Sequence, residues 1–129
     1  MRIKVLVADD HKVMRDLLRA IVQKQDDMEV VGEAANGKEV IEMAKQSRPD
    51  VIIMDAIMPE MTGIEATRAI KSDCPDIVVI ALSIHSDRRY RTAMSAAGAQ
   101  AYLLKDTAFG QLAQTIRAAL SRGKQNQIR

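Results

Sequence analysis

Val51-Ile52-Ile53-Met54 is a short apolar run that is followed directly by the acidic residue Asp55. A continuous apolar run of this kind predicts a strand that is buried on both faces of a sheet. Residues 3–8 form a similar run, which leads into Asp9 and Asp10. Because open parallel sheets bind their ligands at the carboxyl ends of the strands, we expect these three acids to meet at one edge. Carboxylate clusters of this kind bind hard cations.

Apolar runs and segments of helical periodicity alternate along the whole chain. Strands are predicted at residues 3–8, 28–34, 51–54, 77–82 and 101–104. Helices are predicted at residues 11–25, between Gly37 and Pro49, and at residues 64–72, 87–97 and 107–121, with Gly98 as the cap of the fourth. This alternation predicts an α/β fold in which helices cover both faces of a parallel sheet.

Length and composition favour one globular domain. The chain has 129 residues, of which 47% are hydrophobic and 28% are charged. Its net charge of +2 is too small to indicate binding to nucleic acid or to a membrane surface. The single cysteine, Cys74, excludes an internal disulfide. The sequence contains neither an apolar stretch long enough for a membrane span nor a signal-peptide pattern, and we therefore expect a cytoplasmic protein.

Two more polar side chains, Ser83 and Lys105, follow the last two predicted strands. In a parallel sheet they would open onto the same edge as the acids. Two carboxylates about 4 Å apart repel by roughly 4 kcal/mol at an effective dielectric near 20, so a proton, a lysine or a divalent cation must offset this cost. A site of few carboxylate oxygens suits Mg²⁺. A hydroxyl, an ammonium and Mg²⁺ around Asp55 would stabilise a phosphoryl group carried on its carboxylate.

These strand ends resemble those of the receiver domains of two-component response regulators. The matching motifs are Asp9-Asp10, Asp55 followed by Met58-Pro59 and Gly63, then Ser83, and Tyr102-Leu103-Leu104-Lys105. The resemblance covers about residues 3–120, and details such as Asp10-His11 and Leu104-Lys105-Asp106 are most similar to the NarL/LuxR-type subfamily. It implies a flavodoxin-like (βα)5 fold, a three-layer sandwich whose five parallel strands lie in the order 2-1-3-4-5.

The resemblance implies a signalling function rather than an enzyme that acts on a separate metabolite. Asp55 would accept a phosphoryl group from a sensor histidine kinase, and the domain would assist its own phosphorylation and dephosphorylation. Mg²⁺ would be bound by Asp10, Asp55 and the main-chain carbonyl of Ile57, with Asp9 acting through water. His11 is expected at the rim of this site.

Three further residues receive roles from the same resemblance. Lys105 would pair with the acceptor carboxylate or its phosphoryl group, and Ser83 would donate a hydrogen bond to a phosphoryl oxygen. Tyr102 would then turn inward and change the surface formed by the fourth helix, the fifth strand and the fifth helix. A charge of about −2 on the phosphorylated acceptor would thus shift this surface from one of two conformations to the other.

The resemblance also bears on domain organisation and partners. Residues 1–122 are expected to form the receiver domain, with residues 123–129 as a linker or tail. A DNA-binding output domain, absent from this chain, would control transcription, and the chain itself is expected to bind no DNA. The alternative is a free-standing receiver that acts by protein–protein contact. The sequence leaves open whether two copies pair, through the first and last helices or through the switching surface.

Three positions, Ile57, His85 (two residues after Ser83) and Asp106, depart from the pattern that many relatives show. Ile57 stands two residues after the acceptor, where relatives often carry a polar side chain, and we hypothesise that it favours a long-lived phosphoryl group. It also argues against an aspartate-based phosphatase, which needs an acid there. Asp106 replaces a proline, so we expect no cis bond before it. A flavin-binding domain is disfavoured because acids occupy the first loop, where flavin phosphate would need hydroxyls and glycine.

Overall fold

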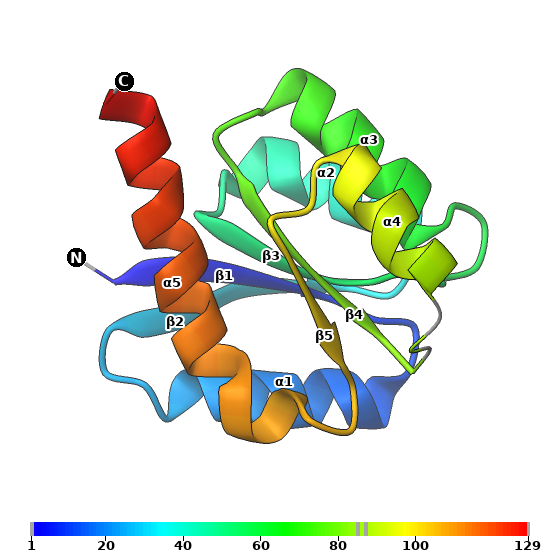
Figure 1. Ribbon diagram of the computed structural model, residues 1–129. Helices are drawn as coiled ribbons and strands as arrows, with labels where there is room; N and C mark the ends of the chain where they lie inside the picture. Colours follow the sequence, from blue (N-terminus) through cyan, green and yellow to red (C-terminus); the bar gives the residue numbers. More distant parts are fainter. Residues whose placement is uncertain (1, 85, 87, 129) are drawn as a thin grey trace.

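A computed structural model describes residues 2–128 except 85 and 87, with the side chains described as far as residue 122. Within this part of the chain, five parallel strands form one sheet in the order β2-β1-β3-β4-β5. The strands are β1 (Ile3–Ala8), β2 (Met28–Ala34), β3 (Val51–Asp55), β4 (Val78–Ser83) and β5 (Ala101–Leu104). The helices are α1 (Lys12–Gln23), α2 (Gly37–Ser47), α3 (Gly63–Asp73), α4 (Arg88–Ala97) and α5 (Ala108–Ile128) (Figure 1). The predicted fold class and strand order are confirmed.

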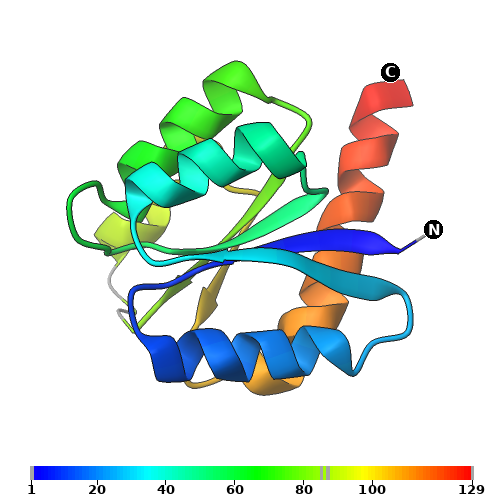
Figure 2. The same cartoon turned by 180° about the vertical axis from the view of Figure 1, so that it is seen from behind.

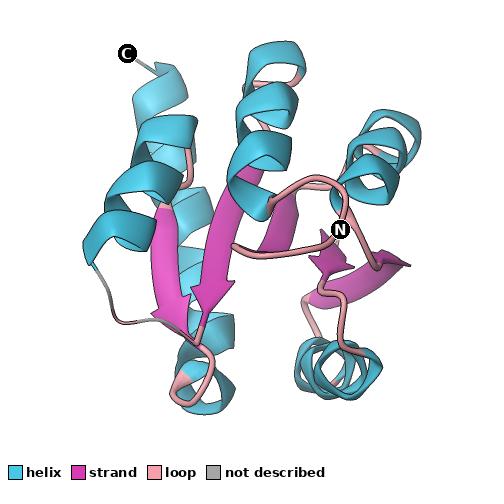
Figure 3. Ribbon diagram, turned by 90° about the vertical axis from the view of Figure 1, so that its right-hand side faces the viewer, coloured by secondary structure: helices cyan, strands magenta, loops and turns pink. Residues whose placement is uncertain are grey.

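The sheet lies between two layers of helices, with α1 and α5 on one face and α2, α3 and α4 on the other (Figures 1 and 3). Alternate residues of each strand face opposite layers, because side chains of a strand point to its two faces in turn. Val5, Val7 and Ile53 pack against α1 and α5, whereas Leu6 and Ile52 pack against the other layer. Two cores, one on each face, therefore hold β1 and β3 at the centre of the molecule.

The ends of three helices follow from local sequence signals. The Asn36 side chain accepts a hydrogen bond from the backbone N–H of Glu39, and so caps α2. Thr62 and Glu65 form a capping box at the start of α3. Gly98 ends α4 with φ of 116°, and the next residue bonds back to the Met94 carbonyl at 2.9 Å. The predicted glycine cap of α4 is confirmed, since few other residues adopt this φ.

Helix α5 differs from its predicted length. Its expected end was residue 121, but it continues to Ile128. The lysine and glutamines that follow residue 122 are good helix formers, and no proline interrupts them. The polarity of this segment therefore predicts that it is exposed, but it does not predict the end of the helix. The last turns of α5 stand clear of the sheet (Figures 1 and 2). None of the helices in the described part of the chain combines the length and apolarity needed to cross a membrane.

Thr67 offers a test of packing in the α3 layer. Its side chain is fully buried, and its hydroxyl has no hydrogen-bond partner among the described residues. Thr67→Val keeps the shape and removes the unsatisfied group, so we expect the free energy of unfolding to rise by about 1 kcal/mol in urea denaturation. Thr67→Ser, the control, should lower it by about 1 kcal/mol because it loses a buried methyl group. A less stable valine variant would show that the hydroxyl is satisfied in solution.

Candidate functional site

The carboxyl ends of four strands bring the predicted site residues to one edge of the sheet. Asp55 is the last residue of β3, and Ser83 is the last residue of β4. Asp9 and Asp10 follow β1, and Lys105 follows β5. The edge strands lie on opposite sides of the β1–β3 pair, so the acids meet where the strand order reverses, which is the usual ligand position in open α/β sheets.

A cavity of about 180 Å³ opens at this edge. Its walls are formed by Asp10, His11, Asp55, Ile57, Ser83, Ile84 and Lys105. A larger cavity of about 390 Å³ lies near Pro49, Asp73 and Leu120, at the amino ends of β3 and β4. That cavity contains none of the predicted site residues, so the smaller one is the candidate functional site.

Lys105 ties two of the acids together. Its ammonium is buried, 3.2 Å from Oδ2 of Asp55 and 2.9 Å from Oδ2 of Asp9. Burial alone would lower the pKa of Lys105, but the close carboxylates of Asp9 and Asp55 outweigh it and raise the pKa above its ordinary value. Lys105 therefore stays charged at neutral pH. The contact with Asp55 matches the expected pairing, whereas the shorter contact with Asp9 was not predicted.

Asp9 is fully buried and is held from several directions. Its Oδ1 accepts the backbone N–H of His11 at 2.9 Å, and its main-chain oxygen accepts a hydrogen bond from the Arg15 guanidinium at 2.7 Å. Oδ2 makes an ion pair with Lys105 but lacks the alignment of a hydrogen bond. The contact of Arg15 was not predicted from the sequence. Its position four residues after His11 could have indicated it, because residues spaced by four lie on the same side of a helix.

The pKa of Asp55 is strongly raised by its surroundings in the site. Its Oδ1 accepts the backbone N–H of Ile57 at 3.1 Å. Burial, followed by the nearby charge of Asp9, raises the pKa of Asp55 from 3.8 to about 7, against the opposing effects of the Ile57 N–H and Lys105. A raised pKa in a buried cluster is typical of a functional carboxyl group.

This shift predicts an unusual pH dependence of stability without metal. The folded protein holds the Asp55 proton more tightly than the unfolded chain, so stability from this group is present below the unfolded pKa of 3.8 and lost as pH rises towards about 7. Asp55→Asn should therefore be more stable than the parent at pH 8, by about 2–4 kcal/mol, and equal to it near pH 4. Urea denaturation of both proteins in EDTA measures the difference. A gap that does not change with pH would contradict the shift.

The cluster fits a divalent cation. Asp9, Asp10, His11 and Asp55 each offer one donor atom, and these atoms all lie within 4.8 Å of one another. Oδ1 of Asp10 is buried without a hydrogen-bond partner in the described part of the chain. Three carboxylates lie close to one lysine, so a cation would relieve their repulsion and bind the buried Asp10 oxygen. Carboxylate oxygens at this density suit Mg²⁺.

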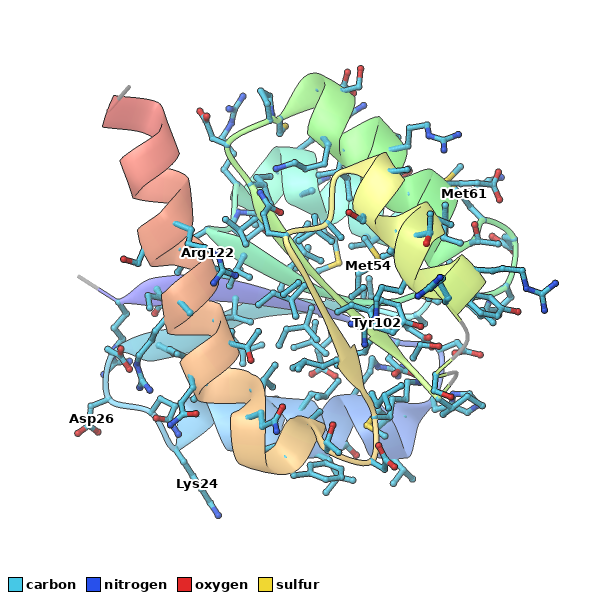
Figure 4. The ribbon with its side chains drawn as sticks, in the orientation of Figure 1. Lys24, Asp26, Met54, Met61, Tyr102 and Arg122 are labelled. Atoms are coloured by element: carbon cyan, nitrogen blue, oxygen red, sulfur yellow. The ribbon has the colours of Figure 1, made fainter. Side chains whose placement is uncertain are left out.

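Ser83 and Tyr102 occupy different parts of the molecule. Ser83 is buried and lines the cavity beside Asp55. Tyr102 lies on β5 opposite Ala81, half-buried on the α4 side of the sheet (Figure 4), and is not among the described residues that line the cavity. The Arg91 guanidinium of α4 lies 5.2 Å from the centre of its ring, which is within the range of a cation–π contact.

The remaining predictions have plain outcomes. The Ile57 side chain is 42% exposed at the mouth of the cavity, next to the acceptor. The Lys105–Asp106 peptide bond is trans, as expected for a residue other than proline. Gly63, part of the motif that follows Asp55, is the first residue of α3 and lies directly against the backbone of Asp55. The structure thus brings Asp10, Asp55, Ser83 and Lys105 to one cavity, with Asp9 buried against Lys105, and leaves Tyr102 outside it.

Comparison with known proteins agrees with this geometry. A sequence profile of the response regulator receiver domain matches residues 5–117. The chain therefore belongs to the response regulator receiver domain family, and its relatives are of the NarL/LuxR type. The predicted family is confirmed.

Two regulators of known sequence and one solved structure are similar to the chain. The chain is 44% identical to the transcriptional regulatory protein YhcZ of Bacillus subtilis, over 87% of this chain and 52% of that protein. It is 43% identical to the response regulator VraR of Staphylococcus aureus, over 96% of this chain and 59% of VraR. A LuxR-family DNA-binding response regulator from S. aureus superposes with a TM-score of 0.85 at 25% identity, over 91% of this chain and 98% of that one. The chain thus spans little more than half the length of YhcZ and of VraR.

Proposed function

We propose that this receiver domain takes up a phosphoryl group on Asp55 in a Mg²⁺-dependent reaction and signals through its surface. The observation that carries the proposal is the Asp55 carboxylate, which is buried against the Lys105 ammonium at 3.2 Å inside a cluster of acids. One free carboxylate with a fixed cation beside it is the arrangement that stabilises an acyl phosphate. The domain is then a phosphoacceptor that assists its own modification, and not an enzyme for a separate metabolite.

Each residue has a separate part in this reaction. A carboxylate oxygen of Asp55 would form a bond to phosphorus as the bond between phosphorus and the donor breaks. Lys105 would move from two carboxylates to a phosphoryl oxygen, and the Ser83 hydroxyl would donate to another. Mg²⁺, bound by Asp10, Asp55 and the main-chain carbonyl of Ile57, with Asp9 acting through water, would supply positive charge that stabilises the phosphoryl oxygens.

The response would pass from Ser83 to Tyr102. When Ser83 turns to a phosphoryl oxygen, the Tyr102 ring would turn inward into the space that the Ser83 side chain vacates. That movement would break the contact with Arg91, which now holds the ring at the surface of α4. The surface of α4, β5 and α5 would then differ between the two states, as a charge-driven switch requires.

Membership of the family supports a proposal for the phosphoryl donor and for the output. A sensor histidine kinase would donate the phosphoryl group from a phosphohistidine. Residues 1–122 would act as the receiver and residues 123–129 as a connection to a DNA-binding domain absent from this chain, because the relatives are longer transcriptional regulators. Transcription would then be the output, and a second copy of the domain would be a partner in a homodimer. A free-standing receiver is the alternative.

Intact-protein mass spectrometry tests the proposal. The chain is incubated with Mg²⁺ and acetyl phosphate, and a parallel sample contains EDTA. We expect the mass of one phosphoryl group in the first sample, and no gain either in EDTA or in Asp55→Asn. A phosphoryl group that forms equally well in Asp55→Asn would overturn the assignment.

Ile57 sets the expected lifetime of the phosphoryl group. Its exposed apolar side chain at the mouth of the cavity offers no hydrogen bond to an attacking water. Ile57→Asn should therefore accelerate dephosphorylation by about tenfold, since an oriented water reacts faster. Loss of the added mass is followed over time, with Ile57→Val as the control. Equal rates for the asparagine variant and the parent would refute this role.

A further inference from the structure

The imidazole of His11 lies beside the carboxylates of the proposed metal site. Its Nδ1 is 3.2 Å from Oδ1 of Asp10 and 3.4 Å from Oδ1 of Asp9. Together with Asp55, these residues place four donor atoms within 4.8 Å of one another. His11 thus adds a nitrogen donor to side chains that otherwise offer oxygen.

The spacing of these atoms is that of ligands around one ion. In an octahedral complex with bonds of about 2.1 Å, adjacent donor atoms are ~3.0 Å apart. The distance of 3.2 Å between His11 Nδ1 and Asp10 Oδ1 is close to this value. The same Asp10 oxygen is buried and lacks a hydrogen-bond partner in the described part of the chain. Both atoms are therefore placed to bind a common cation.

The backbone of His11 fixes its position, and the imidazole ring takes no part in capping α1. His11 is the N-cap residue of α1, but its side chain makes no capping hydrogen bond. Its backbone N–H donates to Oδ1 of Asp9 at 2.9 Å, which fixes the residue next to the cluster. The side chain is 71% exposed, so close packing does not account for its position. The contacts that the structure gives the ring are those with the two carboxylates.

We propose that His11 is a nitrogen ligand of the metal site and shifts its selectivity from Mg²⁺ towards first-row transition-metal ions such as Mn²⁺ and Co²⁺. Mg²⁺ favours oxygen ligands, whereas imidazole nitrogen suits the transition metals. This inference rests on the proposed function, because it concerns the ion bound by Asp10 and Asp55. It assigns to His11 the choice of ion rather than a part in the transfer.

Calorimetric titration with Mg²⁺ and with Co²⁺ at pH 8 tests the proposal, since a metal-bound imidazole must be neutral. We expect His11→Asn to weaken Co²⁺ binding by about tenfold or more and to change Mg²⁺ binding by less than about twofold. The visible absorption of bound Co²⁺ should also change, because a nitrogen donor is replaced. Lys12→Asn, a change at the exposed neighbouring residue that pairs with Asp16, should leave the Co²⁺ to Mg²⁺ preference as it is.

Two results would overturn the inference. If His11 only occupies space beside the acids, its removal should change the binding of both ions by the same factor. If it has no part in the site, neither affinity should change. Asp10→Asn separates these outcomes from a failure of the proposed function. If Asp10→Asn still binds Mg²⁺, the proposed metal site is wrong. If Asp10→Asn loses Mg²⁺ binding but His11→Asn keeps the parent's Co²⁺ to Mg²⁺ preference, only the role of His11 is refuted.

Discussion

Lys105→Met should slow phosphorylation of the domain by acetyl phosphate by at least about 100-fold at saturating Mg²⁺. The substitution removes the ammonium that contacts Asp55 at 3.2 Å and Asp9 at 2.9 Å. Charge on the transferring group would then be stabilised by fewer donors. The two buried carboxylates would also face each other without their shared partner, so we expect the metal-free variant to lose about 2–4 kcal/mol of stability at pH 8. Rates from intact mass and urea denaturation measure the two effects.

Lys71 provides a matched control for this variant. It is another partly buried lysine, but its ammonium donates to the carbonyls of Pro75 at 2.8 Å and Ile77 at 2.7 Å, away from the acids. Lys71→Met should cost about 1–2 kcal/mol of stability and leave the phosphorylation rate as it was. If Lys105→Met is phosphorylated as fast as Lys71→Met, the ammonium of Lys105 has no part in the transfer.

Gly63→Ala should damage both the fold and the acceptor. A Cβ at Gly63 would overlap the carbonyl oxygen of Asp55, and would lie 2.8 Å from the Asp55 carbonyl carbon and 3.0 Å from Cα of Ala56. Because these are backbone atoms at the end of β3, the overlap can be relieved only by a shift of the backbone that also moves Asp55. We expect the free energy of unfolding to fall by about 2–3 kcal/mol. A displacement of the carboxylate by a few tenths of an ångström should also slow phosphorylation by about tenfold or more.

Gly110→Ala is the control for this steric effect. Apart from its chain neighbours and the backbone of its own helix, no atom of the described residues lies within 4 Å of a Cβ built at Gly110, which is exposed on α5. Alanine there should raise stability by about 0.5–1 kcal/mol, since it favours the helix, and should not change phosphorylation. If Gly63→Ala behaves like Gly110→Ala, the contact between the α3 start and Asp55 does not position the acceptor.

The strand ends were predictable because their signals are local. An apolar run followed by a polar residue marks the carboxyl end of a buried strand, and four such ends carry Asp9, Asp55, Ser83 and Lys105. The strand order came from family resemblance, because periodicity does not say which strands are neighbours. The end of α5 was missed for a related reason: polar residues favour exposure but do not stop a helix.

The finer contacts of the site were not predictable from sequence. Whether Lys105 meets Asp55 alone or also Asp9 depends on how β1 and β5 lie on either side of the β3–β4 pair. The close approach of Gly63 to Asp55 depends on how the β3–α3 loop folds back, with the Gly63 N–H bonded to the Ala56 carbonyl at 3.0 Å. Such contacts join residues through space, and the pattern of a single chain does not encode them directly.

The site of phosphorylation is the most direct test of the account. After incubation with acetyl phosphate and Mg²⁺, borohydride reduces an aspartyl phosphate to homoserine, and the change can be located in peptides by mass spectrometry. We predict homoserine at position 55 and at no other aspartate. Homoserine at position 9 or 10, or a phosphoryl group that survives reduction on a hydroxyl side chain, would contradict the assignment of Asp55 as the acceptor.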